Sequence, residues 1–429
     1  MNIIRYPKKE QWAAIAERPH LDHTQLAATV RQVLDDVRQR GDEAVKDYEL
    51  RFDHARLSQL AVTQEEIRQA KRLVSPELKE AIRLAHRNIY KFHKAQLFKK
   101  VRVKTQPGVD CWQQSVAIER VGLYIPGGTA PLFSTVLMLA TPAKIAGCKE
   151  IVLCTPPAAD GSVNPAILVA ASIAGVNRIF KAGGVQAIGA MAYGTESVPR
   201  VYKIFGPGNQ YVMAAKQQVA TDQVAIDMPA GPSEVCVIAD ETANAAFVAA
   251  DLLSQAEHGV DSQVIMITTS ETLLDDVQTE VARQLDRLPR KEIAAKALEN
   301  SNMVLVKDKQ EAMALSNSYA PEHLIIQTAD YMAMARQVVN AGSVFLGPYA
   351  CESAGDYASG TNHTLPTHGH ATAYSGVNLD SYQRKITFQH LTEKGVRNIG
   401  HAVELMAEAE QLDAHKNAMT IRLKSLSDK

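Results

Sequence analysis

Hydrophobic side chains recur at helical spacing through much of the first hundred residues after Asp22. The clearest case begins at Ser75-Pro76-Glu77, where serine is a favoured N-cap and proline suits the first helical position. Apolar residues then follow at intervals of three and four: Leu78, Ile82, Ala85, Ile89 and Phe92. This spacing predicts an amphipathic helix with one face on a core.

From Val116 onward the pattern changes to short β-rich runs that alternate with helices of small residues, and each run ends in a Gly or Pro loop. The first set predicts strands at 121–125, 151–154, 178–180 and 201–205, with helices at 134–146, 165–174, 188–193 and 211–219. After 226–233 the second set predicts strands at 235–238, 264–268, 304–306 and 343–346, with helices at 243–258 and 273–285. Alternating strands and helices indicate mostly parallel sheets.

The sequence therefore predicts an α/β protein of two domains with mostly parallel sheets, together with small helical segments at its N- and C-terminal ends. We expect one α/β domain built from residues 23–123 and 234–377, interrupted by a second α/β domain at residues 124–233. Residues 1–22 form the N-terminal segment and residues 378–429 the helical C-terminal segment.

Composition narrows the class of partner. The chain has 429 residues, of which 46% are hydrophobic and 22% charged, as is typical of a folded globular protein. Its formal net charge of −1 favours neither nucleic acid nor an anionic membrane as a partner. The longest apolar stretch, 165–176, is shorter than the ~18 residues that a membrane span needs, and the N-terminus has no apolar signal region. We therefore expect a cytoplasmic protein that binds a small molecule.

The five cysteines are odd in number and never spaced as Cys-x-x-Cys, which argues against a disulfide framework and against a structural zinc ribbon. A reducing compartment agrees with this usage. A catalytic thiol at Cys148 or Cys154 has no activating base beside it in the sequence.

Four glycine loops follow predicted strands: Gly127-Gly128, Gly183-Gly184, Gly206-Pro207-Gly208 and Gly231-Pro232. Open α/β sheets bind ligands at the carboxyl ends of their strands, so these loops are candidate binding elements. The third loop approaches the dinucleotide fingerprint, but Tyr211 stands where its last glycine should be. The glycines are equally compatible with tight turns that have no binding role.

Two short motifs offer titratable chemistry. Gln255-x-x-His258 places an amide oxygen and an imidazole three residues apart on a predicted helix, where they could share a cation or simply lie on the surface. Asp356 and His415 are available as further ligands, although spacing does not show that they approach. Glu322-His323, in an expected loop, could supply two acid/base groups or be an ordinary surface pair.

Longer motifs carry a resemblance to a known family. The segment Ile226-Asp-Met-Pro-Ala-Gly-Pro-Ser-Glu-Val-Cys-Val-Ile-Ala-Asp240, followed by Ala249-Ala-Asp-Leu-Leu-Ser-Gln-Ala-Glu-His258, resembles the signature region of histidinol dehydrogenases. The resemblance extends through most of the chain, in Val121-Gly-Leu-Tyr-Ile-Pro-Gly-Gly128, Phe205-Gly-Pro-Gly-Asn209, Ala320-Pro-Glu-His-Leu324, Glu352-Ser-Ala-Gly-Asp-Tyr-Ala-Ser-Gly-Thr-Asn-His363 and Leu412-Asp-Ala-His-Lys-Asn417.

This resemblance implies a zinc-dependent enzyme of histidine biosynthesis that oxidises L-histidinol through L-histidinaldehyde to L-histidine and reduces two NAD. It implies one zinc ion per subunit, with these ligands: Gln255, His258, Asp356 and His415. His323 would accept the hydroxyl proton, and Glu322 would activate the water that hydrates the aldehyde. Substrate would contact the four zinc ligands and these further residues: Ser233, His323, His363 and Glu410.

The same resemblance implies that NAD lies against Tyr124, Gln186 and Asn209, on incomplete Rossmann-like domains. It also implies a homodimer in which the C-terminal segment crosses over, so that Glu410 and His415 complete the partner's site. Two alternatives remain at this point. One is a zinc hydrolase that uses the same ligands with Glu322 as base, and the other is a non-catalytic protein that binds an amino-acid-like ligand.

Overall fold

A computed structural model describes residues 1–18, 23–127, 131–176, 178–222, 224–229 and 231–427. Gly128 of the first glycine loop and Ala230 of the signature segment lie outside the described residues. The chain divides into two compact units. The first consists of Met1–Gln96 and Glu119–Ser381, and the second of Leu97–Ile118 and Tyr382–Lys429.

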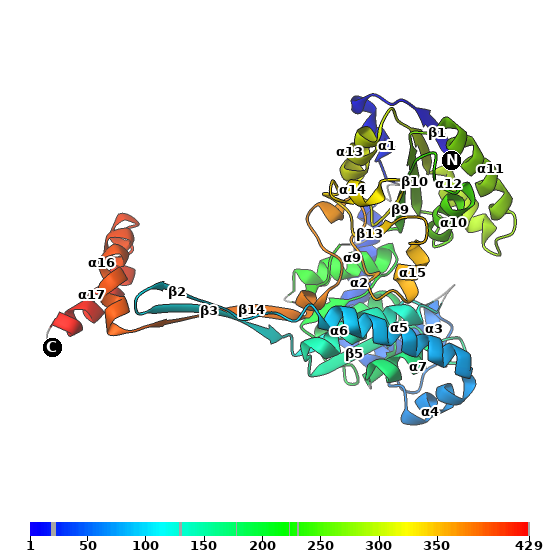
Figure 1. Ribbon diagram of the computed structural model, residues 1–429. Helices are drawn as coiled ribbons and strands as arrows, with labels where there is room; N and C mark the ends of the chain where they lie inside the picture. The colour runs from blue at the N-terminus through cyan, green and yellow to red at the C-terminus, as the bar shows by residue number, and fades with distance from the viewer. Residues whose placement is uncertain (19–22, 128–130, 177, 223, 230, 428–429) are drawn as a thin grey trace. The chain divides into compact units, whose positions relative to one another are not determined.

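The first unit contains a six-stranded parallel sheet, here called sheet A, with the order β1-β11-β10-β9-β12-β13 (Figure 1). Its strands are β1 (Asn2–Arg5), β9 (Glu234–Ala239), β10 (Gln263–Thr268), β11 (Asn302–Leu305), β12 (His323–Gln327) and β13 (Ser343–Leu346). When β9 to β13 are numbered from one to five, they lie across the sheet as 3-2-1-4-5, which is the order of a doubly wound fold.

Helices cover both faces of sheet A, as Figure 1 shows. Alternate side chains of β9 face opposite ways: Val235 and Val237 belong to one buried cluster, and Cys236 and Ile238 to the other. The first cluster includes α10 (Ala245–Ala256), α11 (Glu271–Leu285) and α12 (Lys291–Glu299). The second includes α1 (Trp12–Ile15), α13 (Lys309–Tyr319) and α14 (Tyr331–Ala335). Two buried faces explain why the strands are apolar almost throughout.

Sheet B, also in the first unit, has five parallel strands in the order β6-β5-β4-β7-β8. They are β4 (Arg120–Tyr124), β5 (Glu150–Thr155), β6 (Arg178–Lys181), β7 (Lys203–Phe205) and β8 (Ala225–Ile226). In chain order this is again 3-2-1-4-5, with a change of direction between β4 and β7. A buried cluster joins the sheet to α2 (His23–Arg40), α3 (Asp42–Phe52), α8 (Gly184–Tyr193) and α9 (Gln210–Ala220).

Four further helices of this unit pack on one another: α4 (Gln64–Leu73), α5 (Pro76–Lys94), α6 (Phe133–Ala146) and α7 (Pro165–Ala174). The predicted N-cap of α5 is present, because the Ser75 hydroxyl accepts a hydrogen bond from the Leu78 amide at 3.2 Å. Short elements complete the unit: α15 (Glu352–Tyr357) and the 3-10 helices η1 (Lys9–Gln11), η2 (His370–Thr372) and η3 (Leu379–Tyr382).

The second unit differs from the purely helical segment that the sequence predicted. It contains an antiparallel sheet of β2 (Val101–Gln106), β3 (Val109–Ala117) and β14 (Gln383–Leu391), followed by α16 (Glu393–Ala409) and α17 (Asp413–Ser427). Most side chains of β2 and β14 are exposed, although both strands alternate apolar and polar residues in part, as in Val101-Arg-Val103 and Ile386-Thr-Phe388.

The α/β fold class with mostly parallel sheets is confirmed. Among the described residues, we find no helix that combines the length and the apolar character needed to cross a membrane.

Candidate active site and cofactor loops

The predicted acid/base pair stands at the amino-terminal end of β12, beside the start of its neighbour β9. Glu322 precedes the strand and His323 is its first residue, so the pair is not in a loop as expected. Glu322 Oε2 accepts a hydrogen bond from the Glu234 amide at 2.9 Å, and His323 Nδ1 lies 3.2 Å from the Glu234 carbonyl oxygen. Both side chains are buried. The backbone of Glu234, the first residue of β9, therefore holds both members of the predicted acid/base pair in place.

Gln255 joins this arrangement from the last turn of α10. Its Nε2 lies 3.1 Å from His323 Nδ1 and 3.2 Å from Glu322 Oε2. Gln255 Oε1 is buried and has no hydrogen-bond partner among the described residues. The predicted helix continued to His258, but α10 ends at Ala256, so His258 lies two residues beyond it. An amide oxygen held in this way is available as a metal ligand.

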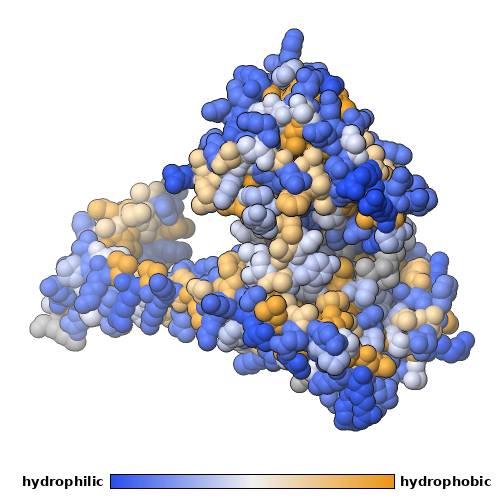
Figure 2. All heavy atoms as spheres, turned by 45° about the vertical axis from the view of Figure 1, so that its right-hand side comes forward, coloured by the Kyte–Doolittle hydropathy of each residue, from blue (hydrophilic) through white to orange (hydrophobic). Residues whose placement is uncertain are grey.

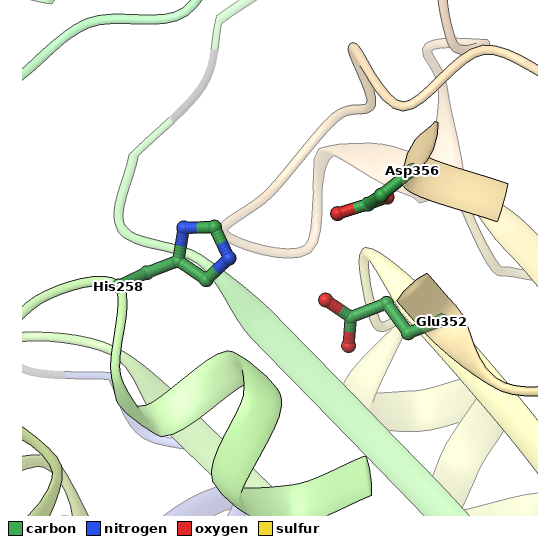
Figure 3. Close-up of side chains that lie close together, drawn as sticks. All are labelled: His258, Glu352 and Asp356. Carbon is green, nitrogen blue, oxygen red and sulfur yellow. The ribbon is translucent and has the colours of Figure 1, made fainter. Parts of the chain in front are cut away.

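His258 lies close to two carboxyl groups of α15, those of Glu352 and Asp356. One ligating atom from each of His258, Glu352 and Asp356 lies within 4.8 Å of the others, and Figure 3 shows the three side chains pointing toward one another. Glu352 Oε2, Asp356 Oδ1 and His323 Nε2 are buried and find no hydrogen-bond partner within the described chain. Buried polar atoms without partners are costly unless a ligand satisfies them. Mixed imidazole, carboxylate and amide donors fit a zinc ion.

Three carboxyl groups set the electrostatics around His323. Burial lowers the pKa of the imidazole, but Glu352 and Glu322 outweigh this and raise that pKa well above its ordinary value. Burial raises the pKa of Glu322, and it raises the pKa of Glu352 to about 8. Burial also opposes ionisation of Asp356, yet the nearby His323 imidazole, whose Nε2 lies 3.6 Å from Asp356 Oδ1, leaves the pKa of Asp356 lowered. Such a concentration of acidic groups favours a bound cation.

The remaining predicted substrate residues fall in both units. His363 Nδ1 lies 3.0 Å from the Asp356 carbonyl oxygen, and its Nε2 lies 3.1 Å from Thr135 Oγ1. Ser233 directly precedes β9 and is half-buried. Glu410 caps the end of α16 and His415 lies on α17, both exposed and both in the second unit. Their membership of this site stays a prediction.

The predicted cofactor residues stand at the carboxyl edge of sheet B. Tyr124 ends β4, and its hydroxyl accepts a hydrogen bond from the Gly184 amide at 3.1 Å. Gln186 lies in the first turn of α8 and is buried. Asn209 caps α9, because its Oδ1 accepts hydrogen bonds from two amides of the first turn. The edge between β4 and β7 is the switch point at which open α/β sheets bind ligands.

Gly206 is held firmly beside Tyr124 at this edge. Its φ of +129° suits glycine, and a Cβ there would lie 2.1 Å from the Tyr124 carbonyl oxygen. The Gly206 amide donates to Asp227 Oδ2 at 2.8 Å, and its carbonyl oxygen accepts from Lys216 Nζ at 2.9 Å. Lys216 and Asp227 are themselves a buried ion pair. The loop that leads to Asn209 is therefore clamped on both sides.

Sequence reasoning missed three residues that shape the active site: Glu352, Glu234 and Arg18. Glu352 stands four residues before Asp356, a spacing that places both on one helical face and was available in the motif. Arg18 binds the Glu234 carboxylate with Nε at 2.6 Å and Nη2 at 3.0 Å. Arg18 also lies over the Tyr319 ring, 4.2 Å from its centroid. Nothing local links Arg18 to Glu234, because 216 residues separate them.

Comparison with known proteins decides the family. A family model described as histidinol dehydrogenase matches residues 16–423. The chain belongs to the histidinol dehydrogenase family. A histidinol dehydrogenase of Bacteroides thetaiotaomicron is 66% identical over 426 residues, which cover 99% of this chain and 100% of the relative. The chloroplastic histidinol dehydrogenase of Arabidopsis thaliana is 53% identical and covers 97% of this chain and 90% of its own.

A solved structure agrees with the sequence relatives. The crystal structure of histidinol dehydrogenase from Elizabethkingia anophelis has 54% sequence identity and a TM-score of 0.98. The match covers 100% of this chain and 99% of that one. The prediction of an NAD-dependent oxidoreductase of histidine biosynthesis is therefore confirmed. Histidinol dehydrogenase membership favours this reading over the hydrolase and the binding-protein alternatives.

Proposed function

We propose that the protein oxidises L-histidinol through L-histidinaldehyde to L-histidine, with reduction of two NAD and one zinc ion per subunit. The observation that carries this proposal is a set of buried, unpartnered polar atoms around His323. These atoms, which lack hydrogen-bond partners among the described residues, are Gln255 Oε1, His323 Nε2, Glu352 Oε2 and Asp356 Oδ1. A metal and a polar substrate would satisfy them together.

The zinc ligands of this chain would be Gln255, His258 and Asp356, with His415 as the fourth protein ligand. Two of them, His258 and Asp356, belong to the group whose ligating atoms lie within 4.8 Å of one another. Zinc, when bound, would hold the imidazole and amino nitrogens of histidinol and add positive charge beside the carboxyl groups. Ser233, His363 and Glu410 would complete the contacts to substrate.

His323 and Glu322 would move protons in the two half-reactions. His323 would accept the hydroxyl proton of histidinol as the first hydride leaves to NAD, which requires the neutral imidazole; the positive charge of a bound zinc ion would oppose the carboxyl groups that raise the pKa of this ring. Glu322 would accept a proton from the water that hydrates the aldehyde, before the second hydride leaves. Hydrogen bonds to Glu234 and Gln255 hold both groups in place, so each is oriented before substrate arrives.

NAD would bind at the switch point of sheet B, against Tyr124, Gln186 and Asn209. The neighbouring Gly206 lets the loop after β7 lie directly against the Tyr124 backbone, because it carries no side chain. This site needs no complete dinucleotide fingerprint, since the end of β4 and the starts of α8 and α9 supply the three residues.

We also propose a homodimer in which Glu410 and His415 complete the partner's site. The second unit supports this, because every side chain of α17 is exposed or half-buried. Hydrophobic side chains lie on the surface of this unit (Figure 2), among them Val101, Val103, Phe388, Leu405 and Met406. Exposed apolar surface of this kind marks a protein interface. A cytoplasmic location is proposed as well, in keeping with five free cysteines.

The decisive experiment measures NADH formed from limiting L-histidinol, with the protein as purified, after chelation, and after zinc is restored. Two NADH per histidinol, lost on chelation and recovered with zinc, is the expected result. One NADH per histidinol would contradict the role of Glu322 in the second half-reaction. NADH formation that survives complete metal removal would contradict the role of zinc.

A further inference from the structure

A buried carboxyl group outside the active site holds the proposed cofactor loop. Glu49 lies on α3 and has no exposed surface. Its Oε1 accepts hydrogen bonds from the Gly183 amide and from Gln186 Nε2, both at 2.8 Å. Gly183 is the N-cap of α8, so one oxygen of Glu49 joins the loop after β6 to the first turn of the helix. A carboxyl group satisfies a helix N-terminus well.

Gly184 lies beside the oxygen of the Gln186 side chain. Gln186 Oε1 would lie 3.0 Å from a Cβ at Gly184, whose φ of +52° suits glycine. The Gly184 amide donates to the Tyr124 hydroxyl. The Gln186 amide nitrogen is therefore held by Glu49, and Gly184 beside the Gln186 oxygen connects the same loop to Tyr124. Two proposed cofactor residues, Tyr124 and Gln186, are linked through this loop.

The second oxygen of Glu49 has a different environment. Glu49 Oε2 is buried and lacks a hydrogen-bond partner among the described residues. Burial raises the pKa of Glu49 to about 8. The titratable groups around it are Asp53 one turn along α3, Tyr124 at the end of β4 and Cys154 in β5. A neutral carboxyl group costs less to bury than a carboxylate, and its carbonyl oxygen can still accept both hydrogen bonds.

We propose that Glu49 is a positioning residue of the cofactor site, which sets the affinity for NAD by holding Gln186 and the Gly183 amide. The inference rests on the proposed assignment of Gln186 to cofactor binding. No component of the active site around His323 is involved, because Glu49 belongs to the sheet B cluster of α3 and α8. Its loss should therefore affect the binding of NAD and leave the binding of histidinol unchanged.

Steady-state kinetics of Glu49→Ala and Glu49→Gln test the inference. Glu49→Ala leaves two donors without an acceptor, and we expect the KM for NAD to rise about tenfold, equivalent to ~1.4 kcal/mol, with kcat and the KM for histidinol within about twofold. Glu49→Gln keeps an oxygen that can accept both bonds, so it should restore the KM for NAD. In a double-mutant cycle with Gln186→Ala, the double variant should lose less NAD affinity than the sum of the losses in the two single variants.

Asp42→Ala is the matched control. Asp42 begins the same helix, and its carboxylate binds the turn after α8 through Thr195 and the Ser197 amide. This variant should lose thermal stability but keep the KM for NAD. If Glu49→Ala does not fold, Glu49→Asp, which shortens the side chain by one methylene group, replaces it in the same assay.

Three outcomes would overturn the inference. They are an unchanged KM for NAD in the Glu49 variant, an equal rise in the KM for histidinol, and failure of Glu49→Gln to restore NAD binding. Each of these outcomes is judged by comparison with the kinetic constants of active wild-type enzyme. A wild-type protein that forms no NADH from histidinol would instead overturn the proposed function, so the two failures are distinguishable.

Discussion

At the scale of single residues, the first residue of β9 organises the chemistry. The Glu234 backbone contacts Glu322, His323 and Gln255, while its carboxylate binds Arg18. One strand residue therefore links the acid/base pair to the amide ligand. This arrangement holds the reactive groups in place, and Arg18 pairs with the Glu234 carboxylate, whose negative charge still favours the protonated form of Glu322.

His323→Asn tests the base directly. Asparagine approximates the shape of the ring near Nδ1 but cannot accept a proton at neutral pH. We expect kcat to fall by about 10²- to 10⁴-fold with the KM for histidinol within a few fold. Zinc content, measured on the same sample, should stay equal to that of the wild type. Turnover close to wild type would remove His323 from the mechanism.

The raised pKa of Glu49 predicts how stability depends on pH. Between its ordinary value of 4.5 and about 8, an unfolded chain has lost the Glu49 proton whereas the folded protein retains it. The folded state then binds more protons, so the free energy of unfolding falls as pH rises through this window, by up to ~1.4 kcal/mol per pH unit from this group. Above about pH 8 this contribution is constant.

Glu49→Gln removes the titration and isolates this effect. Urea unfolding of both proteins at about pH 5 and about pH 8 should show the wild type losing stability relative to the variant, by an amount on the order of a few kcal/mol. If the difference in unfolding free energy between wild type and Glu49→Gln is the same at both pH values, the assignment of a neutral, buried Glu49 is contradicted.

At the scale of elements, the loops after strands carry the proposed cofactor site. Gly206→Ala tests the clamped loop, since the new Cβ would meet the Tyr124 carbonyl oxygen at 2.1 Å. We expect a loss of ~1–3 kcal/mol in stability and a higher KM for NAD, because the loop must move and carry Asn209 with it. Gly161→Ala is the control, since its φ of +80° is also positive but its nearest contact is 3.3 Å from a leucine side chain. Equal KM values in both variants would count against the loop.

Elements whose bounds are marked by nearby residues could be predicted from the sequence. Elements that depend on pairing between distant segments could not. The helix Pro165–Ala174 and the strand Ser343–Leu346 have the predicted bounds because proline or glycine borders each apolar run. β14 escaped prediction because its pairing with β3 joins segments more than 260 residues apart. The same distinction holds for the candidate site. Short motifs pointed to Gln255 and His323 as candidates, whereas Arg18 and Glu49 act through contacts between residues that are distant in the sequence.

At the scale of the whole molecule, two sheets share one strand order but place the proposed functional residues at different edges. The proposed acid/base and metal residues meet at the amino ends of β9 and β12, and the proposed cofactor residues stand at the carboxyl edge of sheet B. The same topology thus offers two different edges for function. The second unit adds residues that the proposed site still requires, Glu410 and His415.

Mixing two inactive variants tests whether the C-terminal segment serves the partner. Chains carrying His323→Asn and chains carrying His415→Asn are co-expressed, and their mixed dimers assayed. If His415 acts in the partner's site, one site of each mixed dimer has both wild-type histidines, so random pairing restores about a quarter of wild-type activity. If His415 acts within its own chain, the mixture stays as inactive as the separate variants. His415→Asn alone should also reduce zinc content, measured per subunit.

The pairing of β1 with β11 has a consequence for how the protein is made. Asn2–Arg5 form an outer strand of sheet A and align with Asn302–Leu305, so during synthesis this segment waits for about 300 residues before its partner strand is made. The strands of sheet B, in contrast, all lie between Arg120 and Ile226 and can assemble earlier. Synthesis therefore completes the strands of sheet B before those of sheet A, and Asn2–Arg5 remain unpaired with β11 until residues 302–305 have been made.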